Sequence, residues 1–143
     1  VKNLLKKEKN SNMLSIDYYL DFQPKVNNIK KQIITFLEKQ KVKGKKVAGY
    51  GAAAKGNTLL NFCGVKREDN LIEFVVDASP YKQGKYLPGS RIPVVNEKSI
   101  RNQKPDFIII IPWNIKDEII NQLEYVRKWD GKFVTFIPEL KIL

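Results

Sequence analysis

The sequence predicts an α/β protein: a Rossmann-like three-layer α/β/α sandwich with a mainly parallel sheet, preceded by an amphipathic helix. Short apolar segments typical of strands alternate with helical patterns over the second half of the chain. An apolar run in residues 106–111 is typical of a strand buried on both faces of a parallel sheet. A glycine-rich segment, residues 49–56, directly follows the first expected strand. Right-handed crossovers between such strands give the three layers.

Residues 1–23 are expected to form a polar, lysine-rich tail that leads into a folded domain of residues 24–143. Apolar residues then recur at steps of three and four, which predicts an amphipathic helix over residues 24–41. Gly44 is expected to end this helix. Its apolar stripe consists of Val26, Ile29, Ile33 and Leu37.

The first part of the sheet is expected to begin with a buried strand over residues 46–50, which runs into the glycine-rich segment and a helix. Two further strands are predicted at residues 72–77 and 92–95, with a loop rich in Gly, Pro and Lys between them. Asn96 is expected to cap a short helix over residues 97–101.

The segment 106–111 is predicted to be the central strand, and a helix capped by Asn114 should follow it. Asp117 and Glu118 fall in the first turn of that helix, where the helix dipole favours anions. A last strand is predicted over residues 132–137. The inward-facing stripe of the helix is expected to consist of Ile115, Ile119, Leu123 and Val126.

The composition excludes several classes of site in this chain of 143 residues, which has the size of one domain. With no His and a single Cys, a zinc site, a Ser-His-Asp relay and a thiol redox pair lack their parts. The net charge is +11, but residues 1–46 carry 12 basic and 4 acidic residues, whereas the remainder carries 14 and 11. Because the excess of basic residues lies in residues 1–46 and not in the folded domain, we expect no nucleic-acid binding. Docking of this lysine-rich segment on an acidic partner is an alternative.

No part of the sequence predicts association with a membrane. The longest apolar stretch, residues 107–113, is too short to span a bilayer, and the charged N-terminus is not followed by an apolar signal region. We therefore expect a cytoplasmic protein. Because the sequence begins with Val, we expect it to be part of a longer polypeptide.

The glycine-rich turn is the first candidate for a binding site. Gly49 and Gly51 permit a tight strand-to-helix turn, and the alanines after them leave helix N-terminal amides free to meet an anion, to which Lys55 adds a positive charge. The spacing Gly-x-Gly-x-x-x-x-Gly is neither the dinucleotide fingerprint nor a P-loop. Close packing of the helix on the strand is the alternative explanation of the small residues.

Two other features should lie at the same edge of the sheet, where ligands bind in such folds. Asp77 ends the second strand, at a position typical of a ribose-binding acid; alternatively it starts a turn by accepting backbone hydrogen bonds. The loop of residues 82–91 is dense in cations and turn formers, and its alternative role is a solvated loop. Trp113 either stacks on a base or sugar or covers the end of the sheet.

With these residues in view, the chain resembles the C-terminal domain of the sugar-nucleotide C-methyltransferases. The resemblance covers the chain from about residue 20 to the end. Its motifs occur in the order and spacing of that family: residues 49–61, Val76-Asp77, residues 82–89, Ile92-Pro93-Val94, Pro105-Asp106, Pro112-Trp113-Asn114, Glu118-Ile119, Gly131-Lys132-Phe133 and Ile137-Pro138.

The resemblance implies a domain that positions a nucleotide-linked deoxysugar for methylation. In the family, S-adenosylmethionine is bound by a central domain that precedes this one, so no cofactor, metal or catalytic residue is expected here, and this part alone should be inactive. The expected partners are the sugar-nucleotide substrate and the other domains of the parent methyltransferase. A stand-alone nucleotide- or cofactor-binding regulatory module is the alternative.

The candidate substrate-binding residues are selected in part by the sequence pattern and in part by the family resemblance. Gly49 and Asp77 follow from the glycine-rich turn and the end of the second strand. The resemblance implies substrate-side positions at Gly51, Lys55, Asn57, Lys82, Tyr86 and Trp113.

Overall fold

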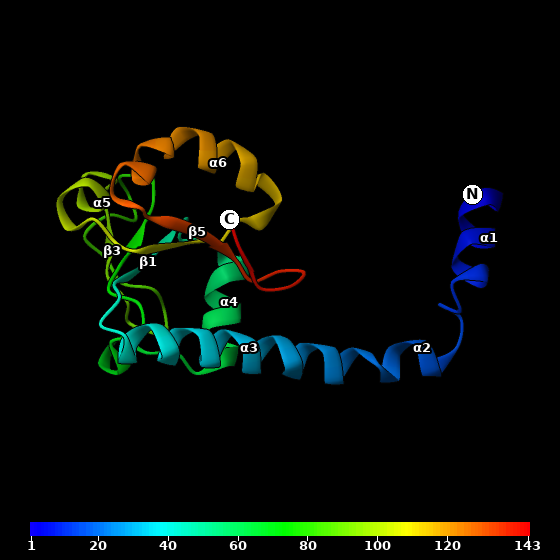
Figure 1. Ribbon diagram of the computed structural model, residues 1–143. Coiled ribbons are helices and arrows are strands. Elements are labelled where there is room, and N and C mark those ends of the chain that lie inside the picture. Colours follow the sequence, from blue (N-terminus) through cyan, green and yellow to red (C-terminus); the bar gives the residue numbers. More distant parts are fainter.

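A computed structural model describes residues 1–143 as a six-stranded sheet with helices on both faces and a helical extension at the N-terminus (Figure 1). The strands lie in the order β3-β2-β1-β4-β5-β6. All neighbouring pairs are parallel except β5 and β6. The α/β class and the mainly parallel sheet predicted from the sequence are thereby confirmed. The strands are β1 Val47–Tyr50, β2 Val75–Val76, β3 Val94–Val95, β4 Phe107–Ile110, β5 Lys132–Thr135 and β6 Lys141–Ile142.

The helices form the two outer layers of the sandwich. In Figure 1, α3 and α4 lie below the sheet, and α5 and α6 lie above it. None of the helices combines the length and the apolar character that a membrane crossing needs. The helices are α1 Lys2–Asn10, α2 Ile16–Leu20, α3 Phe22–Val42, α4 Ala54–Cys63, α5 Lys98–Gln103 and α6 Lys116–Gln122, with short 3-10 helices at Arg67–Asp69 (η1), Trp113–Ile115 (η2) and Glu124–Trp129 (η3).

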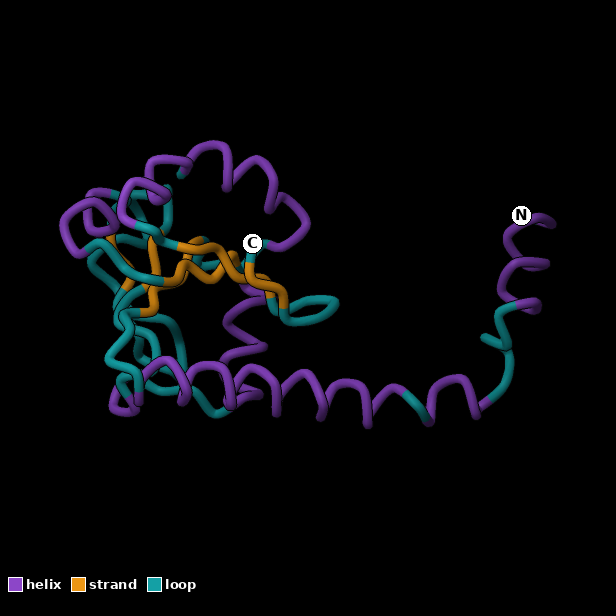
Figure 2. The backbone as a smooth tube through the Cα atoms, in the orientation of Figure 1, coloured by secondary structure: helices purple, strands orange, loops and turns teal.

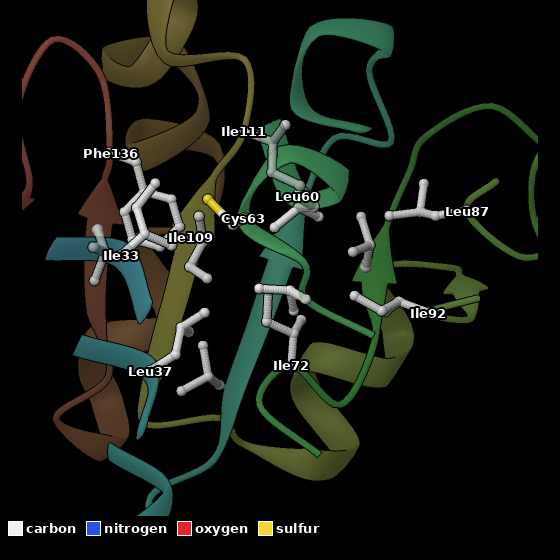
Figure 3. Close-up of a cluster of buried hydrophobic side chains, with 14 of the residues drawn as sticks. Ile33, Leu37, Leu60, Cys63, Ile72, Leu87, Ile92, Ile109, Ile111 and Phe136 are labelled. Atoms are coloured by element: carbon white, nitrogen blue, oxygen red, sulfur yellow. The ribbon is translucent and has the colours of Figure 1, made fainter. Parts of the chain in front are cut away.

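Each face of the sheet has its own apolar core. Below the sheet, Leu37 of α3 and Leu60 of α4 pack against Ile109 of β4 (Figure 3). Above it, Ile119 of α6 packs in the cluster that contains Ile108 of β4. Side chains alternate between the two faces along a strand, so a strand covered on both sides must be apolar throughout. This explains the apolar run of β4.

The order of the strands creates a switch point at the centre of the sheet. From β1 the chain continues outward through β2 to β3, and then crosses back to β4 on the other side of β1. The connections that leave β1 and β4 therefore diverge at their carboxyl ends. In open α/β sheets this divergence leaves the crevice in which ligands bind.

The chain covers the exposed edge of β3 with its own β2–β3 connection. The Gly84 amide donates to the Val94 carbonyl at 2.9 Å, the Val94 amide donates to the Lys85 carbonyl at 2.8 Å, and Tyr86 forms an antiparallel bridge with Pro93. Pairing of this kind satisfies the edge of the sheet. It also folds the cation-rich loop back toward α4.

Several sequence expectations about individual elements were wrong. The strand expected at residues 72–77 is regular only at Val75–Val76, although Glu73 and Asp77 also donate backbone hydrogen bonds to Val47 and Val95, and β6 was not expected. Neither Asn96 nor Asn114 caps a helix through its side chain: Glu97 precedes α5, and the 3-10 turn η2 delays the start of α6 to Lys116. Because this turn changes the direction of the chain, Ile115 is 43% exposed rather than part of the inward stripe.

The first 22 residues, which we call the N-terminal arm, extend away from the sheet (Figures 1 and 2). We expected a loose tail here, but the arm contains α1 and α2, and α3 begins at Phe22 rather than at residue 24. The Ser15 hydroxyl accepts a hydrogen bond from the Asp17 amide and so caps α2. Neither α1 nor α2 contains a buried residue. The division of the chain at residue 23 stays a prediction.

Candidate functional site

The turn between β1 and α4 lies against the connection that follows β4. Gly51 has a φ of +89°, and a Cβ atom there would lie 2.6 Å from Cδ of Pro112. A Cβ on Gly49 would lie 3.0 Å from Cγ2 of Val75. Gly51 is therefore required both by the left-handed backbone and by the close approach of Pro112.

Gly56, the last glycine of the motif, serves packing. It is buried in α4, and an added Cβ would overlap Cγ2 of Ile111, at the end of β4. The helix therefore sits directly on the strand end without an intervening side chain. Close packing of the helix on the strand therefore explains why this residue is glycine.

The amides of the turn before α4 are used inside the protein, so the free amides expected at the helix N-terminus begin only at Ala54. The Gly51 amide donates to the Val76 carbonyl at 2.6 Å, and the Ala52 amide donates to Oδ2 of Asp77 at 2.8 Å. The Ala53 amide donates to the Gly51 carbonyl at 2.8 Å. The next three amides, those of the exposed residues Ala54 and Lys55 and of the buried Gly56, have no acceptor within the chain. Because Gly56 is buried, the N–H groups of Ala54 and Lys55 are the ones that can meet an anion.

Asp77 is the centre of the hydrogen-bond network below the turn. Its Oδ1 accepts from the Ser79 amide at 2.9 Å, and its Oδ2 accepts from the Ala52 amide and from Nζ of Lys82 at 3.1 Å. Burial on its own would raise the pKa of this carboxyl, but the hydrogen bonds from Ser79, Lys82 and Ala52 together hold it below its ordinary value. The hydrogen bond from the Ser79 amide is the one expected of an Asp that starts a turn.

Lys82 is held over the turn by the same network. Its Nζ donates to the Ala52 carbonyl at 3.0 Å in addition to Asp77, although about half of the side chain is exposed. The Gln83 side chain donates to the Asp77 carbonyl at 2.9 Å. The loop that follows β2 is thereby fixed to the loop that follows β1, which closes one side of a cavity.

This cavity has a volume of about 450 Å³. It brings together three of the candidate residues, Asn57, Lys82 and Tyr86. Oδ1 of Asn57 is enclosed and has no hydrogen-bond partner in the protein. The lining consists of Ala52, Ala53, Ala54, Asn57, Lys82, Lys85, Tyr86, Leu87, Pro88 and Val94.

A second cavity, of about 250 Å³, lies on the other side of the same helix start. Lys55 and Trp113 line it, and it shares Ala53 and Ala54 with the first cavity. Five of the eight candidate residues are thus divided between two neighbouring cavities. Gly49, Gly51 and Asp77 line neither cavity.

Sequence reasoning did not single out Lys85, which lines the larger cavity with Lys82. The density of cations in residues 82–91 was the signal, but spacing could not show which lysine faces α4. Lys85 forms no ion pair with any acid of the chain, so its charge is available. The site thus combines two lysines with the free amides that begin α4.

Chemically, the larger cavity is suited to bind an anion that carries an organic group. Lys85 and the start of α4 supply positive potential, Lys82 supplies an N–H donor whose charge is paired with Asp77, and alanine, leucine, proline and valine side chains supply apolar walls. Tyr86 offers an exposed aromatic ring, over which the Arg67 guanidinium lies at 5.6 Å from the centroid.

Several known proteins are similar to this chain. Residues 1–138 match the model of the family described as "C-methyltransferase C-terminal domain". The chain is 34% identical over its whole length to the C-methyltransferase NovU of Streptomyces niveus, and it spans 34% of that relative's length. A solved structure, UDP-D-quinovosamine 4-dehydrogenase from Vibrio fischeri, is similar with a TM-score of 0.48 and 20% identity over 69% of this chain and 93% of the other. The chain belongs to the C-methyltransferase C-terminal domain family.

Proposed function

We propose that this domain holds a nucleotide-linked sugar for an S-adenosylmethionine-dependent C-methyltransferase of which it is the C-terminal part. The observation that carries the proposal is the larger cavity, which Lys82 and Lys85 line together with Ala54, the residue whose free amide begins α4. A sugar nucleotide joins a diphosphate to two organic groups, and the cavity offers positive charge beside apolar and aromatic walls. Family membership supports methyl transfer as the reaction served.

The contribution of this domain is orientation. S-adenosylmethionine, bound elsewhere in the parent chain, supplies an electrophilic methyl group. Lys82, Lys85 and the Ala54 and Lys55 amides hold the diphosphate, so that the sugar projects from a fixed point. Such positioning lowers a reaction barrier by about 7 to 11 kcal/mol in favourable cases. A domain without a reacting group therefore contributes to the rate of the enzyme.

A stand-alone regulatory module was the alternative suggested by the sequence. The match to a relative about three times as long supports the view that the domain works as part of a larger enzyme. Both the methyltransferase domain and the regulatory module require a nucleotide site.

Titration of dTDP and UDP into the 143-residue chain, followed by amide chemical shifts, tests the proposed site. We expect the largest shifts at Ala54, Lys55 and Lys85, and no shifts with S-adenosylmethionine. Lys85→Ala should weaken diphosphate binding by about fivefold, the effect of losing one favourable charge of about 1 kcal/mol. Lys128→Ala, which removes an equally exposed charge from η3, is the control.

Two results would contradict the proposal. One is a set of shifts confined to the N-terminal arm. The other is an equal loss of affinity in Lys85→Ala and Lys128→Ala, which would mean that the diphosphate responds only to the overall charge of +11.

A further inference from the structure

The N-terminal arm exposes an unusual amount of apolar surface. Leu14 is 74% exposed and Ile16 is 72% exposed. An ordinary surface carries isolated apolar residues, but here they follow one another along a single short segment. The large apolar side chains of the arm that are exposed are Val1, Leu4, Leu5, Leu14, Ile16, Tyr18, Tyr19, Leu20 and Phe22.

The rest of the domain neither covers the arm nor needs it. The buried residues of α3 lie in its C-terminal half, from Ile33 to Gln40, where the helix packs on the sheet. The arm contributes no residue to either apolar core. Figure 1 shows α1 at the far end of α3, away from the sheet and its helices. The apolar surface of the arm is thus left over after the domain has formed its own cores.

The arm is nevertheless ordered as an amphipathic element. Ile16 and Leu20, four residues apart, share one face of α2. The Tyr19 hydroxyl donates to the Met13 carbonyl at 2.9 Å and ties the segment between α1 and α2 to α2. In α1, Leu4 and Leu5 are flanked by lysines, which gives an apolar centre with a charged rim. This is the anatomy of a protein interface.

The arm also belongs to the domain as the family defines it. The family match begins at residue 1, and the match to NovU includes the arm while leaving about two thirds of that relative unmatched. In a C-terminal domain, the arm is the segment nearest to the part of the chain that comes before it. The part of the chain that can cover an exposed apolar face at that junction is the preceding domain.

We propose that residues 4–22 are the docking surface for the methyl-transferring domain that precedes this one in the parent chain. The inference rests on the proposed function, because that function places the methyl donor in the preceding domain. Apolar contact along α1, α2 and the start of α3 fixes the orientation of the two domains. It thereby fixes the direction in which the cavity beside α4 presents a bound sugar.

Hydrogen exchange in the parent chain and in the 143-residue chain tests the proposal. We expect the amides of residues 4–22 to exchange at least tenfold more slowly in the parent chain than in the domain alone. The triple variant Leu14→Ala, Ile16→Ala and Leu20→Ala, which preserves helix propensity, should abolish that protection and lower the rate of methyl transfer. The double variant Val42→Ala and Tyr81→Ala, at residues 88% and 83% exposed outside the arm, is the matched control.

Three outcomes separate the possibilities. Equal exchange of residues 4–22 in the two proteins overturns the docking. A dimer of the 143-residue chain in sedimentation, dissociated by the triple variant, assigns the arm to a second copy instead. Absence of dTDP and UDP binding at Ala54 and Lys85, with the arm still protected in the parent chain, contradicts the proposed function and leaves the docking in place.

Discussion

Asp77 illustrates how a single side chain organises the proposed site without facing the ligand. It is only 8% exposed, and both of its carboxylate oxygens accept hydrogen bonds from the protein. Its negative charge holds Lys82 at the rim of the cavity and fixes the Ala52 amide in the turn. We infer that Asp77 positions the binding groups, and that Lys82 and Lys85 make the contacts.

Asp77→Asn should lower the free energy of unfolding by about 1 to 3 kcal/mol at pH 7, since an amide group would face donors that now meet a carboxylate. Folding lowers the pKa of Asp77, so the unfolded chain takes up the proton first on acidification. The stabilisation is therefore present above the unfolded pKa and is lost as pH falls below about 4. Urea denaturation from pH 7 to pH 3 should show wild type and variant converging.

The control for this prediction is Asp130→Asn. Asp130 is exposed, forms no side-chain hydrogen bond or ion pair, and has a left-handed φ of +60° that asparagine also adopts readily. The free energy of unfolding of this variant should differ from that of wild type by the same amount at every pH. A constant difference between wild type and Asp77→Asn down to pH 3 would contradict the assigned role of Asp77.

At the scale of the element, α4 is placed by its contact with the end of β4. Gly56 allows the helix to touch Ile111 directly, and this contact places the first residues of α4 beside the two cavities. On the opposite face, Gln122 of α6 donates to the Tyr50 hydroxyl and to Glu97, both at 2.8 Å. The start of α4 is thereby positioned by close packing, whereas α6 is held by these hydrogen bonds in addition to the packing of Ile119.

Gly56→Ala should destabilise the domain by about 1 to 3 kcal/mol, because the added methyl group overlaps Ile111, and overpacking outweighs the better helix propensity of alanine. Thr58→Ala, at an exposed position of the same helix, should not destabilise it. Urea denaturation measures both. In an Ile111→Ala background, Gly56→Ala should cost less than in wild type, and equal costs would rule out the assigned contact.

At the scale of the whole molecule, the domain consists of a self-sufficient sandwich and an arm that adds nothing to its cores. Both apolar clusters are built from residues of α3 onward. The two cavities lie at the carboxyl ends of the strands, around the start of α4. The proposed ligand site and the proposed docking surface therefore reside in separate parts of the molecule and can be altered independently.

Removal of residues 1–21 should change the free energy of unfolding by no more than about 0.5 kcal/mol, since no residue of α1 or α2 is buried. Thermal and urea denaturation of the shortened chain check this expectation. The shifts caused by dTDP should also be retained. A loss of several kcal/mol would show that the arm packs on the sandwich, which would contradict both this prediction and the docking proposal.

Much of the fold could be predicted because it depends on residue types and their spacing within short segments of the chain. The spacing of Ile33 and Leu37 predicted the helix that covers the lower face, and the apolar run that contains Ile108 and Ile109 predicted a central strand. Helix boundaries were less predictable. Whether Asn114 caps α6 depends on the turn that the chain makes after Pro112, which the residue type alone does not set.

The candidate site was only partly accessible to sequence reasoning. Asn57, Lys82 and Tyr86 were chosen from the sequence and line one cavity, whereas Lys55 and Trp113 line its neighbour. The free amides expected at the helix N-terminus begin only at Ala54, because the Asp77 carboxylate and the Val76 carbonyl accept from the amides of the turn before it. These contacts join residues about 25 positions apart, and no local pattern encodes them.

The sequence by itself determined the alternation of strands and helices, the positions of the glycines and the excess of positive charge, because each depends on residue type and short-range periodicity. Only the tertiary structure decided which amides at the start of α4 lack acceptors, which lysines face them, and that the apolar residues of the arm lie uncovered. Those properties depend on how distant segments fold against one another. Burial and hydrogen bonds between segments distant in the sequence depend on the packing of the whole chain, which short-range patterns do not encode.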